Sequence, residues 1–398
     1  MKISRRAAQE ASIAAKFTAC LRNVLGKPSH PIPLHEPQFK GNEWSYVKEC
    51  LDTGWVSSVG KYVDEFEARL AEYVGSRYAI VVVNGTAALQ MALMVAGVKP
   101  GDEVLVPALS FVATANAVVH CGAVPHFVDS AESTLGLDPS ALQGYLSIVT
   151  ESSERGLLNR RTGRRLAAVV PMHTFGHPVD MPALLSVAKG YNLRVVEDAA
   201  ESLGSFIGSK HTGTFGDMGV LSFNGNKVIT TGGGGAILTD VAADARRLKH
   251  LTTTAKQAHP WEFVHDEVAY NFRLPNINAA LGCAQLERLP TLLGQKRKLA
   301  GSYQAVFGRE PAFSFIGEPA GCRSNYWLNT IRLQNGSTIL RNSLLQSAHD
   351  AGYLCRPVWR LLSRLPMYEA CPRAPLPVAE QLERELINLP SGPGLVKD

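Results

Sequence analysis

A lysine at position 227 stands between two apolar runs, a place where a long cation is unusual. The run from Gly219 to Phe223 precedes it, and residues 236–239 follow the four glycines at 232–235. A cation between buried strands loses solvation unless a partner compensates for it. Covalent chemistry is one reason to keep such an amine, because a desolvated or positively crowded lysine attacks carbonyl groups and forms a Schiff base. Successive glycines let a ligand approach the backbone closely. A surface lysine before a flexible turn is the alternative that this stretch leaves open.

Gly85 and Thr86 stand where the apolar run 79–83 gives way to a helical pattern. Backbone N–H groups and the helix dipole at such a junction bind phosphate, and the threonine hydroxyl adds a donor. The sequence has no G-x-x-x-x-G-K-[ST] loop, and this turn has no G-x-G-x-x-G fingerprint of dinucleotide binding. A phosphate site and an ordinary strand-to-helix turn therefore both remain open.

Asp198 and Phe111 each follow an apolar run. A carboxylate in the apolar setting of Asp198 has a raised pKa unless it meets a cation, and a protonated pyridine nitrogen would supply one. A helix N-cap is the alternative for this aspartate. Phe111 could stack on a flat ring, or it could be an ordinary core residue.

Metal and disulfide chemistry are not indicated. His173 and His177 have i,i+4 spacing, but Gly176 and Pro178 disfavour a zinc-binding helix. The seven cysteines are scattered and form no C-x-x-C motif, which fits a reducing compartment. We therefore predict no metal site.

The elements that must position these residues alternate between predicted strands and predicted helices. Short apolar runs alternate with helical patterns up to about residue 240, which predicts an α/β fold with a mostly parallel central sheet. Ligands in such sheets bind at the carboxyl ends of the strands, so the candidates above are expected to converge there. A smaller C-terminal α+β domain is expected to follow. The predicted divisions are an N-terminal helix and arm over 1–35, a large domain over 36–265 and a small domain over 266–398.

Composition and charge exclude several classes. The chain has 398 residues, of which 45% are hydrophobic and 19% charged, with a net charge of +5; this is the composition of a soluble enzyme. It has no long Lys/Arg run of the kind that binds nucleic acid. It has no apolar run near the ~18 residues that a membrane span needs and no signal peptide. A cytoplasmic location is expected.

Five longer motifs occur along the chain in one order, and with them the sequence resembles the DegT family of fold-type I, pyridoxal-phosphate-dependent sugar aminotransferases. The resemblance extends from about Pro33 to Pro390. Within the family, the sequence most resembles the branch that acts on UDP-linked 4-keto-6-deoxy amino sugars in the legionaminic acid and bacillosamine pathways. The motifs are residues 54–61 (GWVSSVGK), 83–89 (VNGTAAL), 197–204 (EDAAESLG), 222–235 and 270–282 (YNFRLPNINAALG).

The resemblance implies a role for each candidate. Lys227 is expected to bond to the aldehyde of pyridoxal 5'-phosphate and to act as the general base, while Asp198 keeps the pyridine nitrogen protonated. The amino group is expected to pass from L-glutamate to C4 of a UDP-linked 2-acetamido-4-keto-6-deoxy sugar. Asn271 is expected to reach the phosphate from a second subunit, which makes the enzyme a homodimer with shared active sites. The remaining cofactor-binding residues implied are Gly85, Thr86 and Ser222 at the phosphate, Phe111 on the ring, and Glu201 and Asn224 nearby.

The sequence departs from the family pattern in two places. Residues 1–27 match poorly, and Ser363 stands where relatives often have a histidine in the C-terminal substrate loop that begins at Arg356. Three alternative functions remain: a sugar 3-dehydratase that uses pyridoxamine phosphate, a nicotinamide-linked sugar oxidoreductase, and a non-catalytic regulator that binds the cofactor. Lys227 argues against the dehydratase, which has histidine there, and the missing glycine fingerprint argues against the oxidoreductase.

Overall fold

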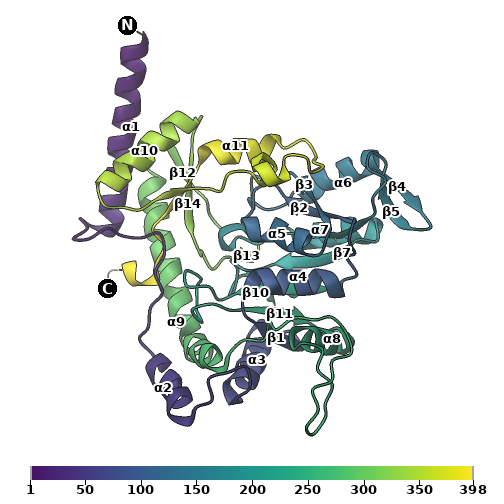
Figure 1. The fold of residues 1–398 in the computed structure, drawn as a ribbon. Helices are drawn as coiled ribbons and strands as arrows, with labels where there is room; N and C mark the ends of the chain where they lie inside the picture. Colours follow the sequence, from purple (N-terminus) through teal and green to yellow (C-terminus); the bar gives the residue numbers. More distant parts are fainter. Residues whose placement is uncertain (1, 397–398) are drawn as a thin grey trace.

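A seven-stranded sheet forms the centre of the protein in this computed structural model, which describes residues 2–396 (Figure 1). The strand order is β1-β11-β10-β7-β6-β2-β3, and only β11 runs against the direction of the others. The predicted mostly parallel α/β sheet is therefore confirmed. Its strands are β1 (Tyr78–Val82), β2 (Glu103–Pro107), β3 (Val124–Val128), β6 (Leu166–Val169), β7 (Arg194–Asp198), β10 (Met218–Ser222) and β11 (Gly235–Thr239).

Helices cover both faces of this sheet, which explains why its strands are apolar throughout. Alternate residues of β2 divide between the two faces: Val104 and Val106 belong to the core beneath α4 and α5, and Leu105 belongs to the core beneath α6 and α7. The helices around the large sheet are α3 (Lys61–Val74), α4 (Gly85–Val95), α5 (Val112–His120), α6 (Pro139–Val149), α7 (Met181–Gly190) and α8 (Ala242–Thr252), and α2 (Glu43–Thr53) packs farther out.

A second, four-stranded sheet follows the long helix α9 (Asn276–Phe307), with the strand order β12-β14-β16-β15. Helix α9 packs on α2 and α3 at one end and on β12 at the other, so it joins the two parts of the molecule. The predicted domain divisions stay predictions. The remaining elements of this part are β12 (Phe313–Phe315), β14 (Asn329–Leu333), α10 (Thr338–Asp350), β15 (Arg356–Pro357), α11 (Pro377–Glu385) and β16 (Leu386–Leu389).

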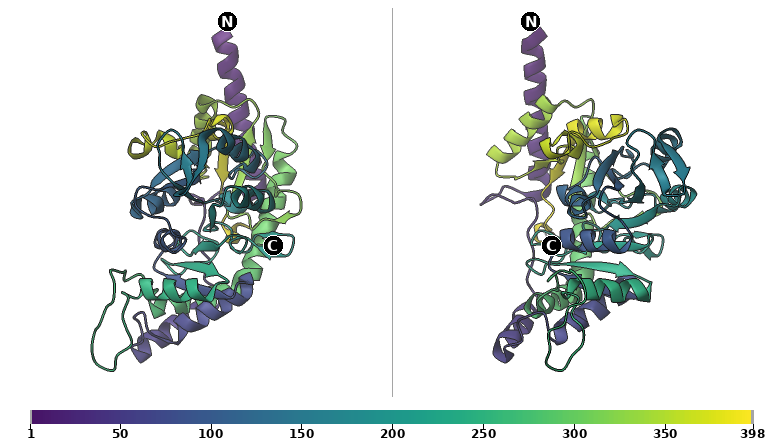
Figure 2. Two further views of the ribbon diagram at one scale, coloured as in Figure 1. Left: turned by 90° about the vertical axis from the view of Figure 1, so that its right-hand side faces the viewer. Right: turned by 45° about the vertical axis from the view of Figure 1, so that its right-hand side comes forward.

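Two small sheets and one long hairpin lie outside these layers. Residues 150–159 form a two-stranded hairpin of β4 (Thr150–Ser153) and β5 (Gly156–Asn159). A three-stranded sheet joins β8 (Phe206–Ile207), β9 (Lys210–His211) and β13 (Cys322–Arg323). Residues 254–268 project from the body in both views of Figure 2.

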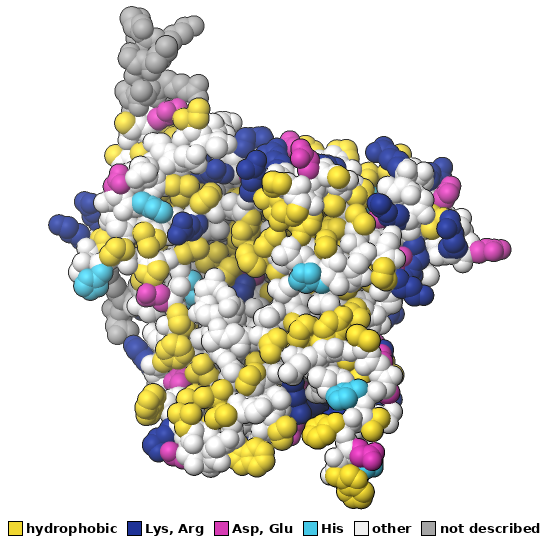
Figure 3. Space-filling model, in the orientation of Figure 1, with side chains coloured by type: hydrophobic (Ala, Val, Ile, Leu, Met, Phe, Trp, Pro, Cys, Tyr) yellow, Lys and Arg dark blue, Asp and Glu magenta, His cyan; other side chains and the backbone are white. Residues whose placement is uncertain are grey.

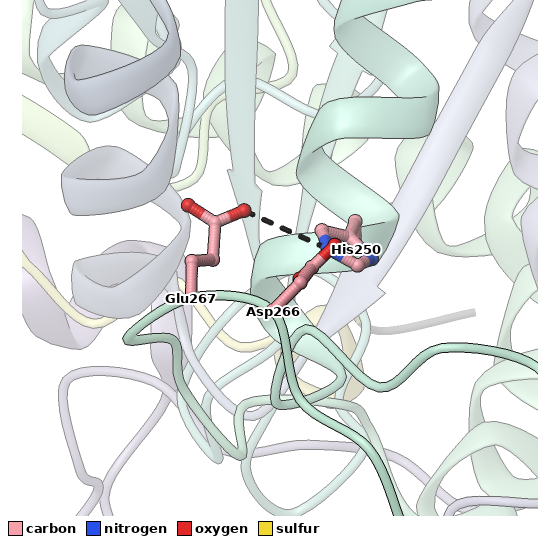
Figure 4. Close-up of side chains that lie close together, drawn as sticks. All are labelled: His250, Asp266 and Glu267. Carbon is pink, nitrogen blue, oxygen red and sulfur yellow. Dashed lines mark hydrogen bonds and ion pairs between the residues drawn. The ribbon is translucent and has the colours of Figure 1, made fainter.

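Three side chains at the base of this projecting hairpin, His250, Asp266 and Glu267, lie close enough together to hold a metal ion (Figure 4). Protein partners already occupy them. His250 Nε2 lies 2.7 Å from the Asp266 carboxylate, and Arg247 Nη2 donates to Glu267 at 2.6 Å. We therefore interpret the cluster as ion pairs that fix the hairpin.

The N-terminal helix α1 (Lys2–Leu25) belongs to the core of the second part, although the family pattern does not reach it. It ends before Gly26, which has a φ of 80°, and a glycine in this left-handed conformation commonly ends a helix. The Phe17 ring is fully buried, with its centroid 5.9 Å from that of Phe307 and 5.8 Å from that of Phe313. The helix therefore closes one side of a packed aromatic cluster.

We expect Phe17→Ala to lower the free energy of unfolding by about 3 kcal/mol, because it removes a buried ring and leaves a cavity. Urea denaturation of the purified variant measures this change. Ala15→Ser, at an exposed position of the same helix, is the matched control and should shift stability by less than about 0.5 kcal/mol. A Phe17→Ala protein as stable as the control would show that α1 is not part of the core.

Candidate active site

A cavity of about 660 Å³ opens at the carboxyl ends of the parallel strands. Its wall contains every predicted site residue except Asn271: Gly85, Thr86, Phe111, Asp198, Glu201, Ser222, Asn224 and Lys227. These residues thus converge at the strand ends, as the sequence predicts.

Lys227 lies in the turn between β10 and β11, with 12% of its side chain exposed. The hydrogen bonds Phe223 N to Gly234 O (2.8 Å) and Lys227 N to Asn224 O (3.0 Å) hold this turn in place. The amine Nζ lies 3.5 Å from Glu201 Oε1 and 4.0 Å from the centroid of the Trp327 ring. The lysine therefore points into the cavity, and the surface-lysine alternative is wrong.

Asp198 ends β7 and is 3% exposed. Burial raises the pKa of its carboxyl, while hydrogen bonds from Thr114 Oγ1 (2.7 Å to Oδ2) and the Ala200 N–H (3.2 Å to Oδ1) oppose that rise. The alternative role as a helix N-cap is wrong, because no α-helix begins after it. Thr114 was missed from the sequence; its one signal is a hydroxyl in the first turn of a helix made mostly of small and apolar residues.

Glu201 lies beside Lys227 and is 2% exposed. The Phe175 N–H donates to Oε2 at 2.9 Å. Burial raises the pKa of this carboxyl to about 7, and the positive charge of Lys227 limits the rise. Near neutral pH the Glu201 carboxyl can therefore hold or release a proton next to the lysine amine.

The N-terminus of α4 forms a backbone cradle at the cavity floor. Asn84 caps this helix by accepting from the Ala87 N–H at 2.8 Å, and Gly85 and Thr86 begin it. A Cβ on Gly235 would come within 2.8 Å of the Gly85 nitrogen, so only a glycine lets β11 pass behind the cradle. N–H groups and the helix dipole at this point favour an anion.

Aromatic side chains form another part of the cavity wall. Phe111, just before α5, is 48% exposed, so its alternative role as a core residue is wrong. Its ring centroid lies 6.3 Å from that of Trp359, which in turn lies 4.8 Å from that of Phe175. Arg356, in the segment predicted as a substrate loop, also lines the cavity. Ser363 from the same segment is buried elsewhere, and Asn271 is exposed outside the cavity of its own chain.

Comparison with known proteins decides the family. The model of the DegT/DnrJ/EryC1/StrS aminotransferase family matches residues 37–398. The chain belongs to this family. The resemblance and the fold class predicted from the sequence are both confirmed.

Curated relatives align over most of the chain of this DegT-family aminotransferase. The GDP-perosamine synthase of Caulobacter vibrioides is 36% identical over 375 residues, which is 92% of this chain and 94% of the relative. The GDP-perosamine synthase of Escherichia coli O157:H7 is 37% identical over 366 residues, or 92% and 94%.

Two solved aminotransferase structures have a fold similar to that of this chain. The aminotransferase TlmJ of Streptoalloteichus hindustanus has a TM-score of 0.82 at 27% identity and covers 92% of this chain and 95% of its own. Helicobacter pylori PseC, an aminotransferase involved in the biosynthesis of pseudoaminic acid, has a TM-score of 0.82 at 26% identity, with 90% and 93% covered.

The cofactor of this DegT-family aminotransferase is pyridoxal 5'-phosphate, as predicted. The cavity fits it: the glycine-lined cradle suits the phosphate, the buried Asp198 carboxylate suits a ring cation, and the Lys227 amine suits the aldehyde. The aromatic wall at Phe111 offers a face to the ring. The role of each residue stays a prediction.

The raised pKa of Glu201 makes the stability of the apoprotein depend on pH. Between the ordinary value of 4.5 and about 7 the folded state binds more protons at this group than the unfolded chain, so stability falls as pH rises through that window. We expect the stability of Glu201→Gln relative to wild type to rise by about 2–3 kcal/mol between pH 5 and pH 8. Urea unfolding of both apoproteins at the two pH values measures the difference.

Glu151→Gln, at an exposed position of the β4–β5 hairpin, is the control and should have no such pH dependence. A Glu201→Gln protein whose stability runs parallel to wild type from pH 5 to pH 8 would contradict the buried, proton-binding state of Glu201.

Proposed function

We propose that this aminotransferase transfers the amino group of L-glutamate to C4 of a nucleotide-linked 4-keto-6-deoxy sugar, with Lys227 and Asp198 as catalytic residues. The observation that carries the proposal is that one cavity holds the Lys227 amine, the buried Asp198 carboxylate and the anion cradle at Gly85 and Thr86. Family membership supplies the reaction class.

Each residue then has a defined task. Bound pyridoxal 5'-phosphate supplies an aldehyde that carries the amino group and a ring that takes up negative charge. Lys227 Nζ takes the α-proton of the amino donor as a general base. Asp198 keeps a proton on the ring nitrogen by pairing its carboxylate with the resulting cation. Glu201, 3.5 Å from Nζ, exchanges a proton with the lysine. Gly85, Thr86 and Ser222 bind the phosphate.

Arg356 supports an anionic substrate. The residue lines the cavity, and its guanidinium makes no hydrogen bond or ion pair with any residue in the range 2–396 that the structure describes. A free guanidinium pairs well with a diphosphate or a carboxylate. A nucleotide diphosphate sugar and L-glutamate both carry such a group.

The nucleotide has two candidates. The motifs resemble the branch that uses UDP-linked 2-acetamido sugars, whereas GDP-perosamine synthases of three organisms align at 36–37% identity. The names of these relatives favour a GDP-linked sugar.

A panel of UDP-, GDP- and dTDP-linked 4-keto-6-deoxy sugars with L-glutamate tests the activity. We expect one nucleotide class to gain an amino group at C4, detected by mass spectrometry and NMR, with 2-oxoglutarate formed in equal amount. Lys227→Ala should lose at least about 10³-fold in turnover, because it removes both the covalent anchor and the base.

Two results would contradict the proposal. A product that has lost its C3 hydroxyl without gaining nitrogen would identify a dehydratase. Cofactor binding without turnover of any sugar or of glutamate would favour the regulator.

We further propose a homodimer with shared active sites. Large hydrophobic side chains are exposed at the end of the molecule where α2 and the 254–268 hairpin lie: Trp44 is 80% exposed, Trp55 57%, Trp261 78% and Phe263 78%. Figure 3 shows hydrophobic side chains on that part of the visible face. Exposed apolar surface of this kind favours a partner. Asn271 pairs with Thr253 at the base of this hairpin. It therefore lies next to the exposed apolar surface that we propose contacts the second copy.

Mixing two inactive variants tests the sharing. Lys227→Ala and Asn271→Ala should each be inactive alone. In a mixed dimer, one of the two sites receives an intact Lys227 from one chain and an intact Asn271 from the other, so the mixed dimer purified through both tags should have about half of the wild-type activity. Assay after co-expression with two affinity tags measures this. A mixed dimer with no more activity than its parents, despite confirmed exchange, would place Asn271 in its own chain's site or outside both.

Within residues 2–396 every helix is too short or too polar to span a bilayer.

A further inference from the structure

Trp327, just before β14, contacts the catalytic turn in two ways. Its ring lines the cavity and lies 4.0 Å, centroid to Nζ, from the Lys227 amine. Its indole Nε1–H donates to the backbone oxygen of Asn226, the residue before the lysine, at 2.7 Å. The tryptophan is a hundred residues away in the sequence, so its position here is a tertiary feature.

The backbone of Trp327 is fixed at both of its polar groups. Its N–H donates to Asn325 Oδ1 at 2.7 Å, and its carbonyl accepts from Lys296 Nζ at 3.1 Å. The amide of Asn325 also donates to the carbonyl of Glu201 at 2.9 Å. The indole and the Glu201 carboxylate, which lies 3.5 Å from Nζ, are therefore held relative to each other, with the lysine amine against both.

We propose that Trp327 is a positioning residue whose indole face docks the ammonium of Lys227 whenever this lysine is not bonded to the cofactor. The face of tryptophan attracts cations more strongly than any other aromatic side chain, and the attraction grows where water is excluded. Glu201 supplies the opposite charge. This inference rests on the proposed role of Lys227.

The dock has a thermodynamic consequence. It stabilises the apoprotein and the complex with pyridoxamine phosphate, in both of which Lys227 is free. It does not stabilise the state in which Lys227 is bonded to pyridoxal phosphate. Loss of the dock must therefore change the affinity for the aldehyde form of the cofactor and leave the affinity for the amine form unchanged.

Titration of the apoprotein with each form of the cofactor tests this. For Trp327→Leu we expect pyridoxal phosphate to bind about fivefold more tightly than to wild type, and pyridoxamine phosphate to bind within twofold. Trp327→Phe, which keeps a weaker aromatic face, should lie between. In the Lys227→Ala background, Trp327→Leu should change the affinity for pyridoxal phosphate by less than twofold, because no ammonium is present to dock.

Two results overturn the inference. Equal weakening of both cofactor forms, or the same change in the Lys227→Ala background, would make Trp327 an ordinary part of the cavity wall. If borohydride traps no cofactor on Lys227 of the wild-type protein, the proposed function fails, and the docking role fails with it; a trapped adduct with equal weakening rejects the docking role alone.

Discussion

Three ionisable side chains, Lys227, Glu201 and Asp198, share one cavity and are largely buried in its wall, so each of them needs a partner for its charge. Burial raises the pKa of both carboxyls. Glu201 has the lysine and a backbone N–H as partners, whereas Asp198 has only neutral hydrogen-bond donors within residues 2–396, at Thr114 and Ala200. When ionised, Asp198 thus lacks a positively charged hydrogen-bond partner, and the proposed pairing with the ring nitrogen of the cofactor would supply one. Binding of the cofactor would therefore also balance the charge of the buried Asp198 carboxylate.

The two sheets contribute different parts of this arrangement. The large parallel sheet brings the strand ends of β7 and β10 together with the first turn of α4, which fixes the carboxylate, the lysine turn and the anion cradle. The second part adds groups that act from the side: Trp327 from before β14, and Arg356 from β15. Helix α9 fixes the position of the two parts relative to each other, because it packs on both.

The sequence was informative where local rules apply. An apolar run that turns into a helix at Gly85 or ends at Asp198 indicates a strand end, and parallel sheets collect such ends on one edge. The individual roles came from family motifs. Thr114, Trp327 and the free guanidinium of Arg356 were not predicted, because each depends on packing between segments far apart in the chain. Asn271 could be named only by resemblance, and a single chain does not contain the surface that it is predicted to reach.

The buried amine of Lys296 has a consequence for biosynthesis. It joins His35, at 3.1 Å, to the carbonyls of Trp327, at 3.1 Å, and Ser391, at 2.7 Å. Segments from the start, the later part and the end of the chain therefore meet at one nitrogen, which is completely inaccessible to solvent. This junction lacks its final acceptor until Ser391 has been synthesised. Trp327, which contacts the lysine turn, is thus fixed in place only after the large sheet that carries this turn has been made.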